Sequence, residues 1–132
     1  MSYSVLVVDD SKVIRSMIRR NMEMSGIQVK TYEAADGAEA LKVLAENWID
    51  LVFADVHMDP MNGIELVQHM AQDTVLSAVP VVMVSSDRSA AHMEQLHQLG
   101  VRAYIKKPFR PENFRDVVAA VLGHLEGGPD AR

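Results

Sequence analysis

The stretch Val5-Leu6-Val7-Val8-Asp9-Asp10 places four consecutive apolar residues directly before two carboxylates. An apolar run of this length, without polar interruption, predicts a β-strand that is covered on both faces, as in a parallel sheet. Residues 51–54 and 81–84 repeat the pattern, and the first of these two runs is followed directly by a third carboxylate, Asp55. We therefore expect buried parallel strands whose carboxyl ends carry polar side chains.

The chain alternates five short apolar runs with five stretches of helical periodicity, which is typical of an α/β fold with a parallel sheet and crossover helices. The runs cover residues 5–8, 27–32, 51–54, 79–84 and 103–105. Residues 27–32 alternate apolar and polar side chains, so this run predicts a strand at the edge of the sheet.

Apolar residues at helical spacing predict the faces by which the helices pack on the sheet. The stripe after the first run comprises Val13, Ile14, Met17 and Ile18, the stripe after the second comprises Ala40, Leu41, Leu44 and Trp48, and the last helix has Phe114, Val117, Val118, Val121, Leu122 and Leu125. The fourth stretch is weaker, with Met93, Leu96 and Leu99. It predicts a helix that is either mobile or a surface for a partner.

Length and composition indicate one domain, which we expect at residues 1–126, followed by a flexible C-terminal tail at residues 127–132. The chain has no cysteine, so it has neither a disulfide nor a thiolate metal site. No secretory leader or membrane-spanning apolar stretch is recognisable, so we expect a cytoplasmic protein without a membrane partner.

The charge balance argues against a nucleic-acid partner. The 13 Lys and Arg residues against 18 Asp and Glu residues give a net charge of -5, which repels a phosphate backbone. The basic cluster of Arg15, Arg19 and Arg20 is short and lacks the interleaved aromatic residues that stack on bases. We interpret this cluster as a solvated helix face.

Polar residues follow four of the five predicted strands: Asp9 and Asp10, Asp55, Ser85, and Lys107. Open parallel α/β sheets bind their ligands at this edge, where the strand order reverses. Three carboxylates gathered at one place repel one another unless a cation or a proton neutralises them. Oxygen ligands without cysteine favour a hard ion, so the pattern indicates Mg²⁺ as the cofactor.

Each of these residues, and Asp87 in the loop after the fourth run, also has an ordinary structural interpretation. Asp10 and Asp87 are residue types that cap helices, and the others suit turns or exposed surface. The histidines form no pair on one helix face, because His92 and His97 are five residues apart. We interpret the histidines as surface residues, and Zn²⁺ is disfavoured.

A carboxylate beside Mg²⁺, a hydroxyl and a lysine can accept a phosphoryl group, because the two cations neutralise the phosphoryl oxygens while the carboxylate attacks. A flavodoxin-type binder is disfavoured, since it needs a glycine- and hydroxyl-rich loop where Asp9 and Asp10 stand. An aspartyl phosphatase is also disfavoured, because it would place an Asp-x-Asp pair there.

Four segments together resemble the receiver domain of bacterial two-component response regulators, over roughly residues 4–123. They are Val5-Leu6-Val7-Val8-Asp9-Asp10-Ser11, Asp55 followed by Met58 and Gly63, Val82-Met83-Val84-Ser85, and Tyr104-Ile105-Lys106-Lys107-Pro108-Phe109. The resemblance implies a doubly wound, flavodoxin-like α/β fold with a five-stranded parallel sheet in the order 2-1-3-4-5 and five helices.

The resemblance also implies roles for individual residues. Asp55 would accept a phosphoryl group from a histidine kinase, while Asp9, Asp10, Asp55 and the backbone carbonyl of His57 would hold Mg²⁺. His57 and Asp87 stand at the positions where the family tunes hydrolysis of the phosphoryl group.

Ser85 would hydrogen-bond the phosphoryl group, Lys107 would pair with it, and Tyr104 would swing inward as the region of the fourth helix rearranges. The Lys107–Pro108 peptide is expected in the cis form. One departure from the family is Met58-Asp59-Pro60, which displaces the usual proline by one residue and inserts a carboxylate. We hypothesise that Asp59 changes the Mg²⁺ affinity or the lifetime of the phosphoryl group.

A receiver domain is a signalling switch that acts chemically only on its own phosphorylation state. Without an output domain in the sequence, we expect a monomer that binds a partner in trans through the surface of the fourth helix, fifth strand and fifth helix. Tyr104 and the single-domain layout favour a chemotaxis regulator that binds the flagellar motor switch. A phosphorelay intermediate serving a histidine phosphotransfer protein, and a non-phosphorylated interaction module, are the alternatives.

Overall fold

A computed structural model describes the backbone of residues 3–126 and the side chains of residues 3–123. The expected tail at residues 127–132 lies outside this range. The described chain contains the strands β1 (Tyr3–Val8), β2 (Val29–Ala34), β3 (Leu51–Ala54), β4 (Val81–Ser85) and β5 (Ala103–Lys106), the helices α1 (Lys12–Met24), α2 (Gly37–Glu46), α3 (Gly63–Gln72), α4 (Ala90–Gln98) and α5 (Pro111–Glu126), and the 3₁₀ turn η1 (Leu76–Ala78).

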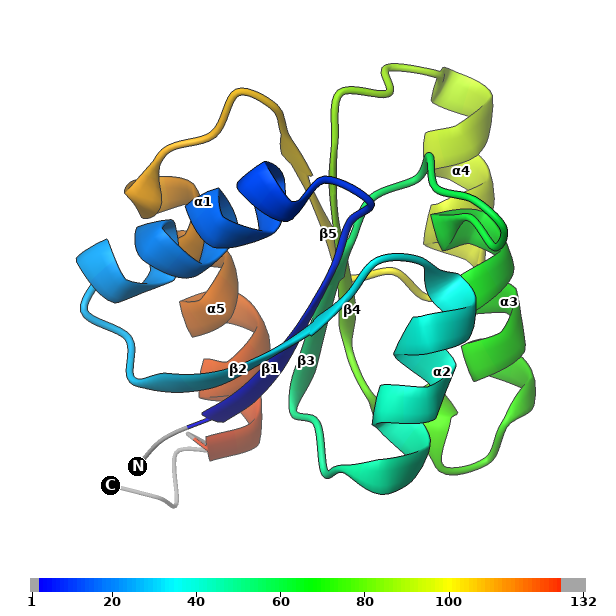
Figure 1. Cartoon of the computed structure of the whole chain (residues 1–132), viewed down its shortest axis with the longest axis horizontal. Helices are drawn as coiled ribbons and strands as arrows, with labels where there is room; N and C mark the ends of the chain where they lie inside the picture. Colours follow the sequence, from blue (N-terminus) through cyan, green and yellow to red (C-terminus); the bar gives the residue numbers. More distant parts are fainter. Residues whose placement is uncertain (1–2, 127–132) are drawn as a thin grey trace.

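The five strands form one parallel sheet in the order β2-β1-β3-β4-β5, which confirms the predicted topology (Figure 1). The alternating run lies at the edge of the sheet as β2, where one side of the strand has no neighbour. From β1 the chain passes to β2 on one side and then to β3 on the other. The strand order therefore reverses between β1 and β3, which is where such sheets bind their ligands.

Helices cover both faces of the sheet, which explains why the central strands are apolar throughout. Figure 1 shows α1 and α5 on one face and α2, α3 and α4 on the other. Along β1, Val5 and Val7 pack into the core under α1 and α5, whereas Leu6 and Val8 pack into the core under the other three helices. Successive residues of a strand point to opposite faces, so each residue of a doubly covered strand has to be apolar.

Two of the predicted apolar stripes were partly wrong. In α1 the inward stripe is Ile14, Ile18 and Met22, at a spacing of four residues, while Val13 and Met17 are 68% and 46% exposed. Each lies one residue before the inward stripe, which turns it about 100° around the helix. Trp48 lies beyond the end of α2 and is 81% exposed, because the chain leaves the helix at Asn47 in an extended conformation.

No helix within residues 3–126 combines the length and the apolar character that crossing a membrane requires.

The start of α3 fixes the loop that follows β3. Asn62 and Glu65 form a reciprocal capping box, in which each side chain accepts a hydrogen bond from the backbone N–H of the other residue. Gly63 donates its N–H to the carbonyl oxygen of Val56 at 2.9 Å. A β-carbon at Gly63 would lie 2.0 Å from the carbonyl oxygen of Asp55, so only glycine allows this close approach.

We predict that Gly63→Ala lowers the free energy of unfolding by about 1–3 kcal/mol, because the added methyl group must displace backbone at the end of β3. Chemical denaturation of the variant and the wild type measures the change. The matched control is Gly123→Ala in α5, where an added β-carbon meets nothing within 4 Å. There the substitution should be neutral or stabilising by about 0.5–1 kcal/mol. Equal effects at the two positions would contradict the close approach at Gly63.

Candidate functional site

The sheet register brings two carboxylates together at the point where the strand order reverses. Val8 is paired with Ala54 across β1 and β3, so the next residues, Asp9 and Asp55, lie side by side. The N–H of Asp55 donates to the carbonyl oxygen of Val8 at 3.1 Å, which continues the ladder to the last residue before the loop.

Lys107 joins these two carboxylates. Its Nζ lies 3.0 Å from Oδ2 of Asp9 and 2.9 Å from Oδ2 of Asp55. The side chains of Lys107, Asp9 and Asp55 are 18%, 2% and 11% exposed. Lys107 reaches this position because its N–H continues the pairing of β5 with β4 through the carbonyl oxygen of Ser85 at 3.1 Å. Three residues that directly follow β1, β3 and β5, far apart in the sequence, thus form one buried ionic cluster.

The cluster separates the acidities of its two carboxyl groups. Burial is the largest influence on Asp9 and raises its pKa, although the N–H of Ser11 and the ammonium group of Lys107 partly oppose it. Burial acts on Asp55 in the same direction, but hydrogen bonds from Ser85 and Lys107 and the lysine charge outweigh it, so the pKa of Asp55 is lowered. Burial alone would lower the pKa of Lys107, yet the two carboxylates raise it. Asp55 is therefore held ionised next to a cation, as a nucleophilic carboxylate requires.

Ser85 and Tyr104 connect the cluster to the loop before α4. Ser85 is fully buried, and its hydroxyl oxygen accepts the N–H of Asp87 at 3.2 Å. The hydroxyl group of Tyr104, a residue of β5, donates to the carbonyl oxygen of Asp87 at 2.7 Å. The structure thus places Ser85 near Asp55 and Tyr104 against the same loop.

Asp10 and His57 lie on the solvent side of the cluster. Both are exposed and line one open surface hollow together with Met58, Asp59 and Asn62. The N–H of His57 points back to Oδ1 of Asp55 at 3.4 Å. The peptides Asp59–Pro60 and Lys107–Pro108 are both cis; the second was predicted and the first was not.

The donor set around Asp9 and Asp55 fits Mg²⁺, which takes oxygen ligands and keeps several of its waters. Two buried carboxylates already share one cation there, and a third carboxylate, Asp10, follows directly in the sequence. Three other side chains, however, bring potential metal-ligand atoms within 4.8 Å of one another. Among the described residues that group is His57, Asp87 and His92.

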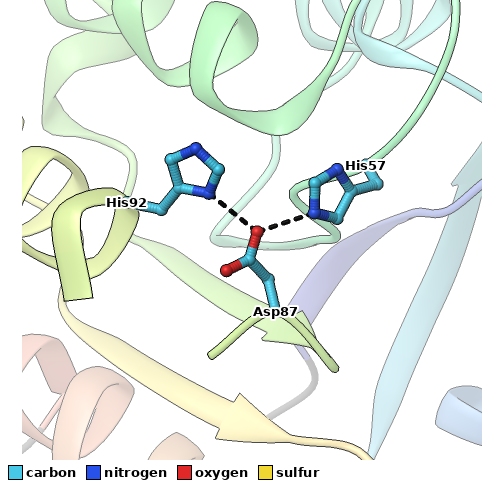
Figure 2. A group of neighbouring side chains, drawn as sticks. All are labelled: His57, Asp87 and His92. Carbon is cyan, nitrogen blue, oxygen red and sulfur yellow. Dashed lines mark hydrogen bonds and ion pairs between the residues drawn. The ribbon is translucent and has the colours of Figure 1, made fainter. Parts of the chain in front are cut away.

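Two of the histidines lie at the surface as predicted, but their contact with a shared carboxylate was not predicted. The ring nitrogens Nε2 of His57 and Nδ1 of His92 lie 2.6 Å and 2.7 Å from the same carboxylate oxygen, Oδ2 of Asp87. Figure 2 shows the carboxylate between the two rings. His57 and His92 are 35 positions apart in the sequence; the first lies in the loop after β3 and the second in α4. A comparison of spacings along one helix therefore could not detect the pair.

The helix caps and one arginine also differ from expectation. Ser11 and Ser89, rather than Asp10 and Asp87, are the N-cap residues of α1 and α4. Arg15, which we placed on a solvated helix face, donates to the carbonyl oxygen of Asp9 at 2.6 Å and pairs with Glu33 of β2 at 2.8 Å. Arg15 thus anchors the backbone of Asp9, a role that depends on the orientation of α1.

Comparison with known proteins gives the family. The sequence profile described as "Response regulator receiver domain" matches residues 5–119. The chain belongs to the response regulator receiver domain family. The polar-differentiation response regulator DivK of Brucella ovis is 29% identical over 123 residues, 93% of this chain and 98% of that protein. Chemotaxis protein CheY1 of Helicobacter pylori is 32% identical over 120 residues, 90% of this chain and 96% of that protein.

Solved receiver structures agree with the fold. The chemotaxis protein CheY4 of Vibrio cholerae superposes with a TM-score of 0.80 at 30% identity, over 92% of this chain and 99% of that one. Receiver domains are signalling proteins rather than classical enzymes, they typically use Mg²⁺, and membership of the family implies a histidine kinase as phosphodonor.

We predict that Asp9→Asn stabilises this receiver domain at pH 7 in the presence of a chelator. Because the folded state raises the pKa of Asp9, the folded state binds more protons than the unfolded state between the ordinary carboxyl pKa and the raised value. Wild-type stability therefore falls as the pH rises through this window, and Asp9→Asn lacks that loss. The amide side chain of the variant would keep an oxygen for the N–H of Ser11, which donates to Asp9 at 2.9 Å.

Thermal unfolding of both proteins between pH 4 and pH 8 measures this effect. The unfolding midpoint of Asp9→Asn should exceed that of the wild type at pH 7, and the difference should shrink towards pH 4. A variant that is less stable at pH 7, by a difference that does not change with pH, would show that ionisation of Asp9 does not destabilise the folded state.

Proposed function

We propose that this chain is a phosphorylation-activated response regulator that accepts a phosphoryl group on Asp55 from a histidine kinase in a Mg²⁺-dependent reaction. The observation that carries the proposal is the bridge from Lys107 to Asp9 and Asp55 at the point of strand reversal. A buried carboxylate that is kept ionised beside an ammonium group and a serine hydroxyl has what a phosphoryl acceptor needs.

Each residue of the cluster has a distinct part in this reaction. Asp55 attacks the phosphorus atom, and the bond between phosphorus and the donor atom breaks as the acyl phosphate forms. Lys107 already contacts the attacking carboxylate and would neutralise the charge that develops on the transferred oxygens. The buried hydroxyl of Ser85 would donate a hydrogen bond to one of these oxygens.

Asp9, Asp10, Asp55 and the backbone carbonyl of His57 would hold Mg²⁺. When bound, the ion supplies a second positive charge for the phosphoryl oxygens. The charge balance of the cluster supports this assignment, because two buried carboxylates against one ammonium group leave one negative charge uncompensated.

The surface formed by α4, β5 and α5 is the proposed partner site. Leu96 is the buried residue of α4, so this helix is attached to the core less extensively than α3, which buries four residues. A hollow between α4 and β5 is lined by Met93, Leu96, His97, Val101, Arg102, Ala103 and Tyr104. Since Tyr104 is bonded to the loop that follows Ser85, a change at the phosphoryl group can reach this hollow through the Tyr104 ring.

We favour a chemotaxis regulator that acts in the cytoplasm as a monomer and binds a flagellar motor switch in trans. The similarity to chemotaxis proteins CheY1 and CheY4 supports this interpretation. The similarity to DivK, named for polar differentiation, favours as second candidate a regulator outside chemotaxis, such as a phosphorelay intermediate that passes the group to a histidine phosphotransfer protein. A binding assay with each candidate partner, before and after phosphorylation, separates the two.

We predict that wild-type protein incubated with acetyl phosphate and Mg²⁺ gains a single phosphoryl adduct, measured by intact mass. The adduct should be absent in Asp55→Asn and in the presence of a chelator. The matched control is Asp59→Asn, which removes an exposed carboxylate from the same loop and should keep the adduct at saturating Mg²⁺. No adduct on the folded wild type would favour the non-phosphorylated interaction module, and an adduct that persists in Asp55→Asn would place the acceptor elsewhere.

We further predict that Asp59→Asn weakens Mg²⁺ binding by about two- to fivefold, because it removes a negative charge from the hollow that Asp10 also lines. The effect should decrease with ionic strength, since water and salt screen an exposed charge. Mg²⁺ titration monitored by calorimetry, at low and at high salt, measures it. Identical affinities in the variant and the wild type would show that Asp59 is an ordinary turn residue.

A further inference from the structure

We propose that His57, Asp87 and His92 form a second metal site, which takes a divalent transition ion of the zinc class. Their ligand atoms, Nε2 of His57, Oδ2 of Asp87 and Nδ1 of His92, all lie within 4.8 Å of one another. The three residues come from the loop after β3, the loop after β4 and the first turn of α4 (Figure 2). The site does not depend on Asp55 or on phosphorylation.

The central ligand, Asp87, is oriented before any ion binds. Its side chain is 6% exposed, and its Oδ1 accepts the N–H of Ser89 at 2.7 Å. This bond fixes the carboxyl plane and leaves Oδ2 directed at the two imidazole rings (Figure 2). The N–H of Ser89 and the imidazole of His92 lower the pKa of Asp87 to about 2, so the ligand is ionised at neutral pH.

The two histidines give the site access to solvent. The side chains of His57 and His92 are 66% and 36% exposed, so an ion can enter and retain water on its open side. Their ring centroids are 6.1 Å apart at an interplanar angle of 63°, so the rings meet edge to face rather than stacked in parallel. Three protein ligands with a remaining position for water is a common arrangement around Zn²⁺.

The donor atoms select the class of ion. Two imidazole nitrogens and one carboxylate oxygen suit Zn²⁺, Ni²⁺ and Cu²⁺, whereas Mg²⁺ prefers oxygen ligands alone. Around Zn²⁺, with ligands at about 2.0–2.1 Å, neighbouring ligands lie about 3.4 Å apart. The separations of 2.6 Å and 2.7 Å from Asp87 must therefore widen by rotation of the exposed rings.

Metal binding also requires that the ring nitrogen facing the ion present a lone pair rather than an N–H. In the hydrogen-bonded cluster, the ring nitrogen that faces Asp87 donates its N–H to the carboxylate. An ion takes that nitrogen's lone pair, so the proton transfers through solvent to the other ring nitrogen.

The location gives such an ion a place in the switch. His57 lies two residues after Asp55, and Asp87 lies two residues after Ser85 and accepts the Tyr104 hydroxyl through its carbonyl oxygen. An ion held by both side chains ties together the loops that follow Asp55 and Ser85. It also attaches α4, through His92, to the loop beside the acidic cluster.

The test is calorimetric titration of untagged full-length protein with Zn²⁺ at pH 7, in excess Mg²⁺ so that oxygen-ligand sites are filled. We expect one Zn²⁺ per chain in the wild type. His57→Ala, Asp87→Asn and His92→Ala should each weaken binding by at least about tenfold. His97→Ala is the matched control, because His97 is an exposed histidine of the same helix and should leave the affinity unchanged.

Circular dichroism of each variant verifies folding, and the exposure of His57 and His92 makes their alanine variants suitable if Asp87→Asn does not fold. Asp55→Asn should retain Zn²⁺ binding, so a failure of this site is distinguishable from a failure of the phosphoryl acceptor. No saturable Zn²⁺ binding, equal affinity in the wild type and both histidine variants, or a loss as large in His97→Ala would overturn the proposal. In each of these cases the three residues would serve only to hydrogen-bond the loop after β3 to the start of α4.

Discussion

One ammonium group shared by two buried carboxylates is the interaction on which the rest of this structure depends. Asp9 and Asp55 are forced together because they end two neighbouring parallel strands in register, and neither can move away without breaking the sheet. Lys107 offsets their repulsion from a third direction, after β5. The fold thus brings like charges together at the strand reversal, and the shared ammonium group keeps one of the two carboxylates, Asp55, in its ionised form.

The fold could be predicted from the sequence because doubly covered strands leave a pattern that does not depend on tertiary detail. The unbroken apolar runs at residues 5–8 and 51–54 identify central strands, and the carboxylates that follow them must share one edge of a parallel sheet. The alternating pattern of residues 27–32 likewise identified the edge. These inferences need only the two-residue period of a strand and the common direction of the strands.

What could not be predicted depends on rotation and loop shape. The side of α1 that faces the sheet differs by about 70° from the predicted centre of its stripe, and this rotation decides that Arg15 contacts Asp9 while Val13 is exposed. The meeting of His57 with His92 requires two loops to approach each other, and no spacing along the chain encodes that approach. The strand ends were therefore predictable, and the contacts between loops were not.

The two clusters at the carboxyl edge of the sheet differ in the ligand atoms that they offer. The acidic cluster offers buried oxygen atoms and a lysine, whereas the second offers two exposed imidazoles around a fixed carboxylate. The two clusters are close in the sequence. His57 lies two residues after Asp55, and Asp87 lies two residues after Ser85. Tyr104 joins this region to α4 and β5, so events at the sheet edge have a physical route to the outer surface.

The most direct test of the account is the titration of the individual aspartate carboxyl groups by ¹³C NMR, in the wild type and in Lys107→Met, without Mg²⁺. The account predicts that in the wild type Asp55 titrates below the ordinary value of about 3.9 and Asp9 above it. In Lys107→Met the pKa of Asp55 should rise, because the ammonium group no longer stabilises its charge. Two ordinary pKa values in the wild type, or an Asp55 pKa that does not change when Lys107 is replaced, would contradict the shared-cation cluster.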